Sequence, residues 1–406
     1  MTDNQRRVDV IIVGGGLVGM TLARALCVHG LETAVVDTAD LSTTLAPAFD
    51  GRCSAIAAAA AKLFQAIGVW DQLAEVAQPI RDIRVTDGAS PLFLHFDGQA
   101  VGGEPLGYMF ENRMLRAALM KTAAATDGLH LFAPDRLVDW TRGPGKVEAV
   151  LAGGQRLVAP LIVAAEGRGS PLREQMGIRS ARWSYRQHGI VTMVAHEKPH
   201  GDIAYERFLP DGPFAILPMP GQRSAIVWTV KASQGPAIMG LSDAAFMAEI
   251  GKRFGDFLGK LELVAPRWSY PLNFNHADHY VERRFALIGD AAHGNHPIAG
   301  QGFNLGVRDV AALTEVLVEA ARLGLDLGSL EVLNRYQRWR RPDNTATAII
   351  MDGLTHLFSN DLRTVTAARR LGLAAVNRIK PLKTFFMREA MGATGKLPAL
   401  LRGELA

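Results

Sequence analysis

The sequence predicts an α/β fold (α+β overall): a domain of alternating strands and helices, interrupted by an inserted antiparallel sheet and followed by a C-terminal helical region. Three observations predict it. Short apolar strands alternate with helices early and again near residue 285, the alternation is lost in between, and the last part is helical in pattern. A chain of 406 residues is too long for one ordinary compact domain, and 48% hydrophobic residues can bury a large core.

The first element is a strand over residues 8–13, an apolar, β-branched run of the kind that is buried in a parallel sheet. The glycine-rich turn Gly14-Gly15-Gly16-Leu17-Val18-Gly19 follows, and residues 17–29 form a predicted helix that Gly30 ends. A second strand over 31–36 carries Asp37 at its tip, 23 residues after Gly14. This order is that of a Rossmann-like nucleotide site.

Each residue type in this turn has a physical task. Gly14 permits a tight turn, Gly16 lets the backbone approach a pyrophosphate, and Gly19 lets the helix pack closely on the strand. The helix N-terminus at Leu17 and Val18 offers unpaired N–H groups and a positive dipole end to phosphates. Asp37 would accept hydrogen bonds from ribose hydroxyls, which favours an unphosphorylated ribose, as in FAD or NAD.

Two later segments favour FAD. A strand over 161–165 ends in Glu166-Gly167, and a strand over 285–288 ends in Gly289-Asp290. A second glycine turn and a helix over 305–322 come next. Its backbone N–H groups and helix dipole would stabilise negative charge on a reduced flavin. Asp290 is placed for the ribityl hydroxyls, and Pro297 would supply a rigid wall without a donor. The residues of this second turn are Pro297, Gly300, Gln301, Gly302, Phe303 and Asn304.

The middle of the chain reads as an antiparallel sheet. Strands are predicted over 190–195, 203–208, 214–217 and 225–230, and a helix over 242–258. One face of this sheet could cover a flavin and form an apolar cavity for a substrate. The candidate substrate residues are Tyr205, Phe208, Phe214 and Pro218.

The whole chain resembles the class A FAD-dependent aromatic monooxygenases, and within them the ubiquinone-biosynthesis hydroxylases. The resemblance rests mainly on the segment HPIAGQGFNLGVRD over residues 296–309. Further matches are Phe49-Asp50-Gly51-Arg52, Glu111-Asn112-Arg113, the segment AYERFLP over 204–210 and the segment FMREAMG over 386–392. The sequence departs from the class at Glu166-Gly167, where Asp-Gly is usual.

The resemblance implies an FAD-binding domain made of residues 1–177 and 276–330, a substrate-binding sheet domain over 178–275, and a C-terminal helical region over 331–406. It places Arg52 close to the flavin and Arg113 near the FAD phosphates or ribityl chain. Pro297, Gly300 and Arg52 are then the residues closest to the chemistry. Nothing in the pattern indicates a metal site, because the two cysteines, Cys27 and Cys53, have no CxxC or His/Cys partners.

The implied reaction is hydroxylation of the ring of a polyprenylated phenol or quinone precursor, through a C4a-hydroperoxyflavin formed with O2. The electron donor is NAD(P)H or a separate redox protein. Two alternatives stay open: a class A hydroxylase of a small soluble aromatic compound, and a non-catalytic flavoprotein scaffold of the biosynthetic complex. A flavin halogenase is disfavoured, because the chain has no WxWxI segment.

Charge is uneven along the chain. There are 44 basic and 40 acidic residues, an excess of +4 that does not indicate nucleic acid as a partner. Residues 361–406 carry nine Lys or Arg and three Asp or Glu, so the excess belongs to the tail. An amphipathic helix over 362–379, with Arg363, Arg369, Arg370, Arg378 and Lys380, would suit an anionic membrane surface.

The expected location is the cytoplasm, either in solution or peripherally on the inner membrane. The first apolar stretch, residues 10–20, is interrupted by glycines and belongs to the nucleotide fold, so it is not interpreted as a secretory signal. A solvated helical cap is the alternative for the tail. A homo-oligomer or a biosynthetic complex is left open.

Overall fold

The computed structural model describes residues 4–88, 93–210, 212–358 and 376–406, and it confirms the predicted fold class. One sheet is six-stranded, with β2 (Val10–Val13) between β3 (Thr33–Val36) and β13 (Leu161–Ala164), all parallel. All three strands are completely buried, as their apolar sequences predict. The sheet is completed by β9 (Leu129–Phe132) beside β3, β21 (Phe285–Leu287) beside β13, and β20 (Val281–Glu282) at the edge.

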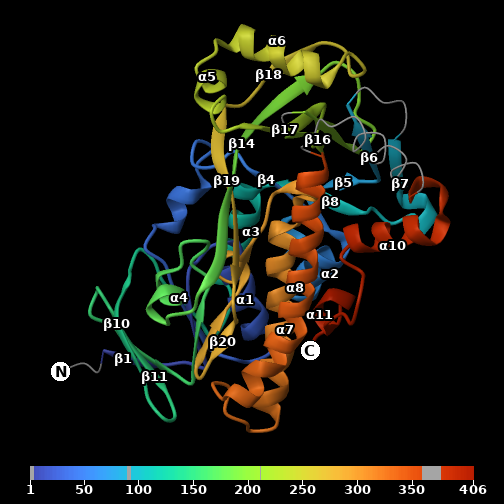
Figure 1. Ribbon diagram of the computed structural model, residues 1–406. Helices are drawn as coiled ribbons and strands as arrows, with labels where there is room; N and C mark the ends of the chain where they lie inside the picture. The colour runs from blue at the N-terminus through green and yellow to red at the C-terminus, as the bar shows by residue number, and fades with distance from the viewer. Residues whose placement is uncertain (1–3, 89–92, 211, 359–375) are drawn as a thin grey trace.

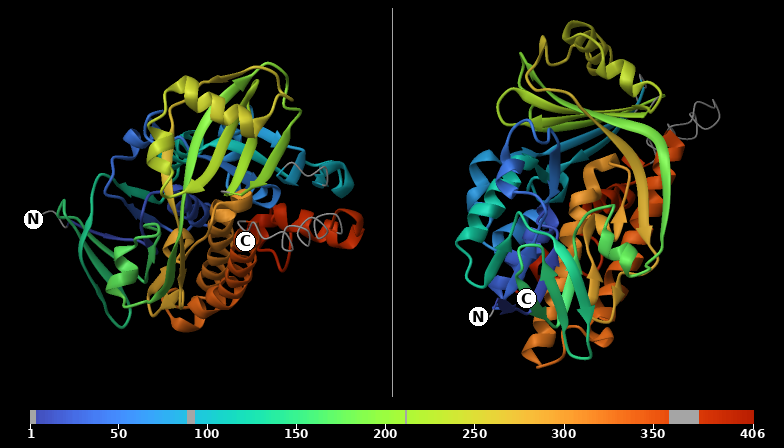
Figure 2. Two further views of the ribbon diagram at one scale, coloured as in Figure 1. Left: turned by 45° about the horizontal axis from the view of Figure 1, so that its top comes forward. Right: turned by 90° about the vertical axis from the view of Figure 1, so that its left-hand side faces the viewer.

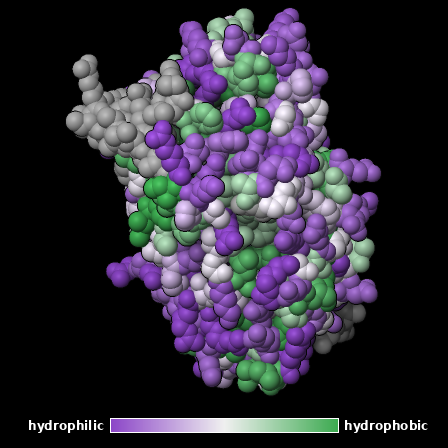
Figure 3. Space-filling model, turned by 90° about the vertical axis from the view of Figure 1, so that its right-hand side faces the viewer, coloured by the Kyte–Doolittle hydropathy of each residue, from purple (hydrophilic) through white to green (hydrophobic). Residues whose placement is uncertain are grey.

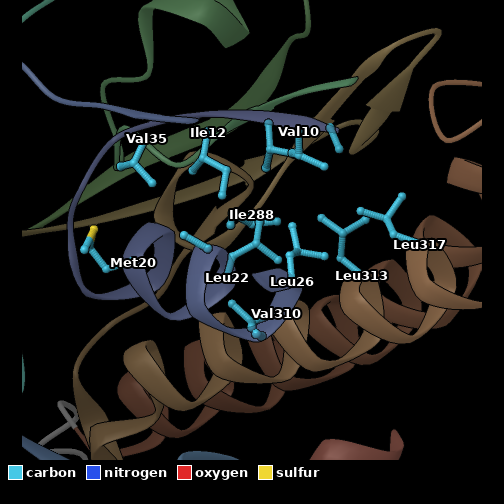
Figure 4. Packing of buried hydrophobic residues seen from close by; sticks show 14 of the residues in the cluster. Val10, Ile12, Met20, Leu22, Leu26, Val35, Ile288, Val310, Leu313 and Leu317 are labelled. Carbon is cyan, nitrogen blue, oxygen red and sulfur yellow. The ribbon is translucent and has the colours of Figure 1, made fainter. Parts of the chain in front are cut away.

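Helices α1 (Leu17–Val28) and α7 (Gln301–Arg322) pack together beside this sheet. Figure 4 shows Leu22 and Leu26 of α1 close to Val310 and Leu313 of α7. These side chains are fully buried. Helix α7 begins at Gln301 rather than at the predicted residue 305, because Gly300 adopts a left-handed conformation (φ 62°) directly before it. The other described helices around this domain are α2 (Ala58–Ala66), α3 (Asn112–Ala124), α4 (Pro171–Gln175) and α11 (Ala399–Arg402).

A larger, mostly antiparallel sheet lies above this domain (Figure 1). Its order is β22-β19-β14-β17-β16-β15-β6-β7, with β18 beside β14. The four predicted strands are confirmed, and the first is longer than expected. The strands are β6 (Asp82–Asp87), β7 (Phe93–Asp97), β14 (Ser180–His196), β15 (Ile203–Leu209), β16 (Gly212–Met219), β17 (Arg223–Lys231), β18 (Leu261–Leu263), β19 (Trp268–Ala277) and β22 (His293–Gly294).

The sheet differs from the predicted domain boundaries at one edge. Strands β6 and β7 come from the first 177 residues, yet β6 pairs in parallel with β15, with Ile203 opposite Asp82 and Phe208 opposite Asp87. The sequence of β6 and β7 does not show which strand they pair with, because pairing between segments this far apart depends on the tertiary structure.

The two faces of the larger sheet have different neighbours, as Figure 2 shows from the side. Helix α6 (Asp243–Phe254) covers one face, where Phe246, Ile250 and Phe254 pack on Phe214 and Trp228. Ser242 caps this helix by accepting a hydrogen bond from the N–H of Ala245, as its sequence favours. The short helix α5 (Gly235–Met239) precedes it.

The opposite face of the larger sheet looks toward the six-stranded sheet. Met193, Ala204 and Ala225 of that face are buried with Met109 of β8 (Gly107–Glu111), and the partly buried Ala55 of β4 (Cys53–Ala57) packs against them. The six-stranded sheet and its helices thus form the base of the molecule, and the larger sheet forms its roof.

Two small sheets complete the molecule. One contains β1 (Gln5–Arg7), β10 (Leu137–Arg142), β11 (Val147–Leu151) and β12 (Arg156–Ala159). The other contains β4 (Cys53–Ala57), β5 (Gln78–Ile80) and β8 (Gly107–Glu111), and it lies between the two main sheets.

The C-terminal region is helical, as predicted. Helix α8 (Leu330–Phe358) packs along α7, and α10 (Lys380–Ala390) follows. Most of the predicted amphipathic helix over 362–379, with Arg363, Arg369 and Arg370, lies outside the described residues. In the part of the chain that the structure describes, we find no helix with the length and hydropathy needed to span a bilayer.

Candidate flavin site

The glycine turn after β2 leaves open space where a phosphate would approach. A Cβ added to Gly14 would lie 2.4 Å from the carbonyl oxygen of Ala165, and one added to Gly19 would lie 1.9 Å from that of Gly14. A Cβ on Gly16 would have no atom within 4 Å. Gly14 and Gly19 are therefore required by the fold itself, whereas Gly16 leaves room beside the start of α1.

The N-terminus of α1 fits a pyrophosphate. No side chain caps the helix, and its first turn holds no acidic residue, so the N–H groups around Leu17 and Val18 face the space beside Gly16. Gly15, Gly16 and Leu17 line a small hollow together with Leu41 and Arg116. The guanidinium of Arg116 adds a positive charge to this hollow.

Asp37 lies at the end of β3, directly beside the turn. Its Oδ2 accepts a hydrogen bond from the N–H of Gly15 at 2.6 Å, and its Oδ1 accepts one from Ala39 at 2.8 Å. Each carboxylate oxygen can accept more than one hydrogen bond, so the pair retains acceptors for ribose hydroxyls. The carboxylate is held by the backbone at the position that the sequence predicts for it.

The second glycine turn runs from Pro297 into α7. Pro297 and Gly300 are exposed, and a Cβ on Gly302 would again meet no atom within 4 Å. The N-terminus of α7, like that of α1, has no capping side chain. Its first peptide groups, from Gly300 through Gln301 and Gly302, can therefore face an anion.

The next two residues of this turn support it from inside. Asn304 is buried; its Oδ1 accepts from the N–H of Ala57 at 2.9 Å, and its Nδ2 donates to the carbonyl of Ala55 at 2.9 Å. The ring of Phe303 stacks on Phe64. Both side chains join the turn to β4 and α2, so their role in the structure is to position the backbone.

Asp290 points its carboxylate at a neighbouring cation. Its Oδ2 accepts a hydrogen bond from Nε of Arg168 at 3.0 Å, and both side chains are partly exposed. Arg168 also donates to the carbonyls of Asn273 and Asn295, which fixes the pair between the two domains. Within the described residues no donor engages the Oδ1 of Asp290, whose role toward a ligand stays a prediction. Arg168 is a neighbour that the sequence analysis did not single out.

A buried network behind Asp290 sets the position of this strand end. Oδ2 of Asp309 accepts from the N–H of Gly289 at 3.0 Å and lies 2.5 Å from Nε2 of His293. Its Oδ1 accepts from Nε of Arg340 at 2.8 Å. Burial alone would raise the pKa of Asp309, but the charges and hydrogen bonds of His293 and Arg340 hold it well below its usual range.

Through Asp309, this network joins the turn after β21 and strand β22 to α7 and α8, and it explains His293 as a structural residue. Asp309 stands within the segment that carries the family resemblance, but its partner Arg340 lies on a different helix. The sequence contains no local signal that could have paired them.

Arg52 forms a charged cluster at the edge of β4. Its Nε and Nη2 donate to the two carboxylate oxygens of Asp50, both at 2.9 Å, and its guanidinium lies 5.0 Å from the ring centre of Tyr270. Arg116 donates to Asp50 from the other side at 2.5 Å. Burial would raise the pKa of Asp50, but the two arginines hold it well below its usual range. About half of the Arg52 side chain remains exposed, and its role beside the flavin stays a prediction.

Two predicted cofactor residues are engaged elsewhere. Arg113 donates to Glu111 at 2.6 Å at the start of α3. Oε2 of Glu166 accepts from the hydroxyl of Ser170, the N-cap residue of α4, at 2.5 Å and from the N–H of Leu172 at 3.2 Å, so it supports the start of that helix. Burial raises the pKa of Glu166. The roles of Arg113 and Glu166 toward FAD stay predictions.

The four candidate substrate residues lie on different faces of the roof sheet. Tyr205 and Phe214 pack in the cluster covered by α6, and Pro218 shares the face of Phe214 because side chains alternate along β16. These three therefore point away from the flavin turns. Phe208 lies on the other face, in a cluster that also contains Ile298.

The comparisons with known proteins agree with this geometry. Residues 7–349 match the family described as FAD binding domain. The chain is 51% identical to ubiquinone hydroxylase UbiL of Rhodospirillum rubrum, covering 97% of this chain and 92% of that protein. It is 36% identical to the 3-demethoxyubiquinol 3-hydroxylase of Escherichia coli, over 95% and 98% of the two chains.

A solved structure shows the same fold at low identity. The crystal structure of p-nitrophenol 4-monooxygenase PnpA from Pseudomonas putida DLL-E4 superposes with a TM-score of 0.79 and 17% identity, covering 97% of this chain and all of that one. The family match covers most of the chain, and the two relatives match almost from end to end. This protein therefore belongs to the FAD-binding domain family and, within it, to the class A flavin hydroxylases of ubiquinone biosynthesis, as an FAD-dependent aromatic monooxygenase.

Proposed function

We propose that the protein hydroxylates the aromatic ring of a polyprenylated phenol or quinone precursor in ubiquinone biosynthesis. The observation that carries this proposal is the near full-length likeness to a ubiquinone hydroxylase, at 51% identity. The geometry supports it, because two uncapped helix N-termini and the Arg52 cluster lie beneath a sheet face that is mainly apolar. Such a face suits a lipophilic ring.

The residues of the chain would bind and orient the reactants. When bound, FAD supplies the electrons and activates the O2 that no side chain can activate. The turn at Gly16 and Asp37 would hold the adenosine diphosphate half. The peptide groups from Gly300 to Gly302 would stabilise negative charge on the flavin ring, while Pro297 limits how closely the substrate ring approaches.

NAD(P)H is the proposed electron donor, with a separate redox protein as the alternative. A short-chain polyprenylphenol, O2 and NADPH or NADH would be mixed with the FAD-loaded protein, and the product analysed for one added oxygen. A hydroxylated phenol supports the proposal. Consumption of reductant that yields hydrogen peroxide alone, with every polyprenylphenol tried, would contradict the proposed substrate class. Hydroxylation of a simple phenolic acid at equal efficiency would favour a soluble aromatic substrate instead.

We also propose that the C-terminal surface contacts an anionic membrane. Ile379 and Phe385 are about half exposed on and beside α10, next to the exposed cations Arg378, Lys380 and Arg388. Figure 3 faces the side of the molecule that carries α10 and shows hydrophobic residues among hydrophilic ones. Apolar side chains between cations are typical of helices that lie in a lipid interface.

Vesicle flotation tests this contact. The protein should float with vesicles that contain anionic lipid, and the double variant Lys380→Glu with Phe385→Ser should stay behind. Lys252→Glu on α6 is the matched control and should float normally. Equal flotation of all three proteins would contradict the proposal. Assembly into a homo-oligomer or a biosynthetic complex is a further proposal, which light scattering of the purified protein would test.

A further inference from the structure

Glu206 is a carboxylic acid on the face of the roof sheet that looks toward the flavin turns. Side chains alternate along β15, so Glu206 shares a face with Ala204 and Phe208. Ala204 belongs to the apolar cluster that contains Ala55, and Phe208 to the one that contains Ile298. Ile298 lies within the second glycine turn, and the side chain of Ala55 lies beside Gly300. Glu206 therefore lies between two apolar clusters that both reach the base of the molecule beside Pro297 and Gly300.

The strands beside Glu206 present apolar side chains to it. Its cross-strand neighbours are Ala215 on β16 and Val85 on β6. In the described part of the chain neither a hydrogen bond nor a neighbouring charge acts on its carboxyl group, and the side chain is only partly exposed. The titratable side chains of the surrounding elements include Asp87 on β6, Arg223 and Lys231 on β17, Glu111 on β8, which pairs with Arg223, and Asp50 and Arg52 before β4.

Burial raises the pKa of Glu206 to about 8, and none of these charged groups contributes to the change. A carboxyl group that is largely shielded from water and has no partner is costly, and a leucine or methionine would pack better between the same two clusters. A structural role thus gives no account of an acid at this position. A polar group of a ligand that contacts the carboxyl group would explain why an acid stands here.

Resting on the proposed function, we propose that the carboxyl group of Glu206 contacts a ring hydroxyl of the phenolic substrate and takes its proton during hydroxylation. The phenol O–H bond breaks, the proton moves to a carboxylate oxygen of Glu206, and the electron pair stays on the ring oxygen. The ring becomes more electron-rich at the positions ortho and para to that oxygen. The proton leaves Glu206 to solvent or returns to the product.

The acidity of the two groups suits this transfer. A phenol has a pKa of about 10, so the carboxylate of an ordinary glutamate, with a pKa of about 4.3, is a weak base toward it. A carboxylate whose pKa lies near 8 is much closer to the phenol and accepts its proton more readily. Because the base form exists above that pKa, turnover of a phenol should rise with pH through about 8.

The test compares Glu206→Gln and Glu206→Asp with Glu249→Gln on α6 as the matched control. Each FAD-loaded protein receives a short-chain polyprenylphenol or its methyl ether, which has no proton to give. For Glu206→Gln we expect kcat with the phenol to fall about 100-fold or more and to lose its rise with pH. Turnover of the ether should equal that of the unaltered protein. Glu206→Asp should restore part of the phenol rate.

A binding measurement gives a second readout that needs no turnover. The phenol should perturb the absorbance of the oxidised flavin, and its affinity for the unaltered protein should change with pH near 8 but not for Glu206→Gln. FAD content and thermal denaturation show whether the variants fold. Unchanged kcat and pH dependence in Glu206→Gln would overturn the inference, as would an equal loss with phenol and ether. A failure of the proposed function appears in the unaltered protein itself, which would then hydroxylate neither compound and show no pH-dependent binding.

Discussion

Two glycines of the first turn should respond in opposite ways to the same substitution. Gly16 has φ −70° and ψ −177°, which alanine adopts without strain, and its added Cβ would meet no atom within 4 Å. Gly16→Ala should therefore leave the stability of the cofactor-free protein within about 1 kcal/mol of the original. The new methyl group would instead occupy the space through which a pyrophosphate reaches the N–H groups of α1.

The loss of affinity follows from those N–H groups. A hydrogen bond to a charged group contributes about 1.5–3 kcal/mol, so displacing the phosphate from one donor should weaken FAD binding roughly 10- to 100-fold, and from two donors more. Gly19→Ala is the matched control. Its Cβ would lie 1.9 Å from the carbonyl oxygen of Gly14, so α1 must shift and the cofactor-free protein itself should lose about 3 kcal/mol or more.

Two assays separate the effects. Quenching of flavin fluorescence on titration gives the Kd for FAD, and denaturant unfolding of the cofactor-free proteins gives the free energy of unfolding. We expect Gly16→Ala to raise the Kd for FAD and Gly19→Ala to lower the free energy of unfolding. Normal FAD affinity in Gly16→Ala would refute the placement of the pyrophosphate beside Gly16. A large loss of stability in the same variant would refute the assignment of its space to a ligand.

Three further predictions concern single carboxylates. Asp309→Asn should destabilise the protein by about 3–5 kcal/mol, because the buried Arg340 keeps a charge without its main partner. The depressed pKa of Asp309 means that its stabilisation is present above about pH 4 and is lost in stronger acid. The free energy of unfolding of the variant should therefore change less with acid than that of the original. Asp37→Ala should weaken FAD binding about tenfold and leave FMN, which lacks the adenosine ribose, unaffected; an equal loss for both flavins would contradict its role. Glu206→Gln should resist denaturant better than the original at pH 9 and equally at pH 4, since an acid with a pKa of about 8 in the folded state and about 4.3 in the unfolded state loses stability progressively between these two pH values; identical curves at pH 9 would contradict the raised pKa.

The sequence by itself determined the nucleotide-binding half of this protein. The strand before Gly14, the helix after it and Asp37 lie within about thirty residues, and each depends on its neighbours in the chain. The turn from Pro297 to Asn304 is equally local. Short-range patterns of this kind predict both the elements and the chemistry of the site, so the fold class and the cofactor family could be predicted from the residues alone.

Only the tertiary structure decided which side chains of the roof sheet look at the flavin turns. Tyr205 and Glu206 are neighbours in sequence, yet they point to opposite faces, and a shift of one residue would exchange them. The aromatic residues of β15 make Tyr205 the candidate that the sequence favours, whereas the pairing of β15 with β16 and β6 places Glu206 on the face that looks toward the six-stranded sheet. The pairing of Asp309 with Arg340 has the same origin. Contacts between segments far apart depend on how the elements pack, and no local pattern in the chain encodes that packing.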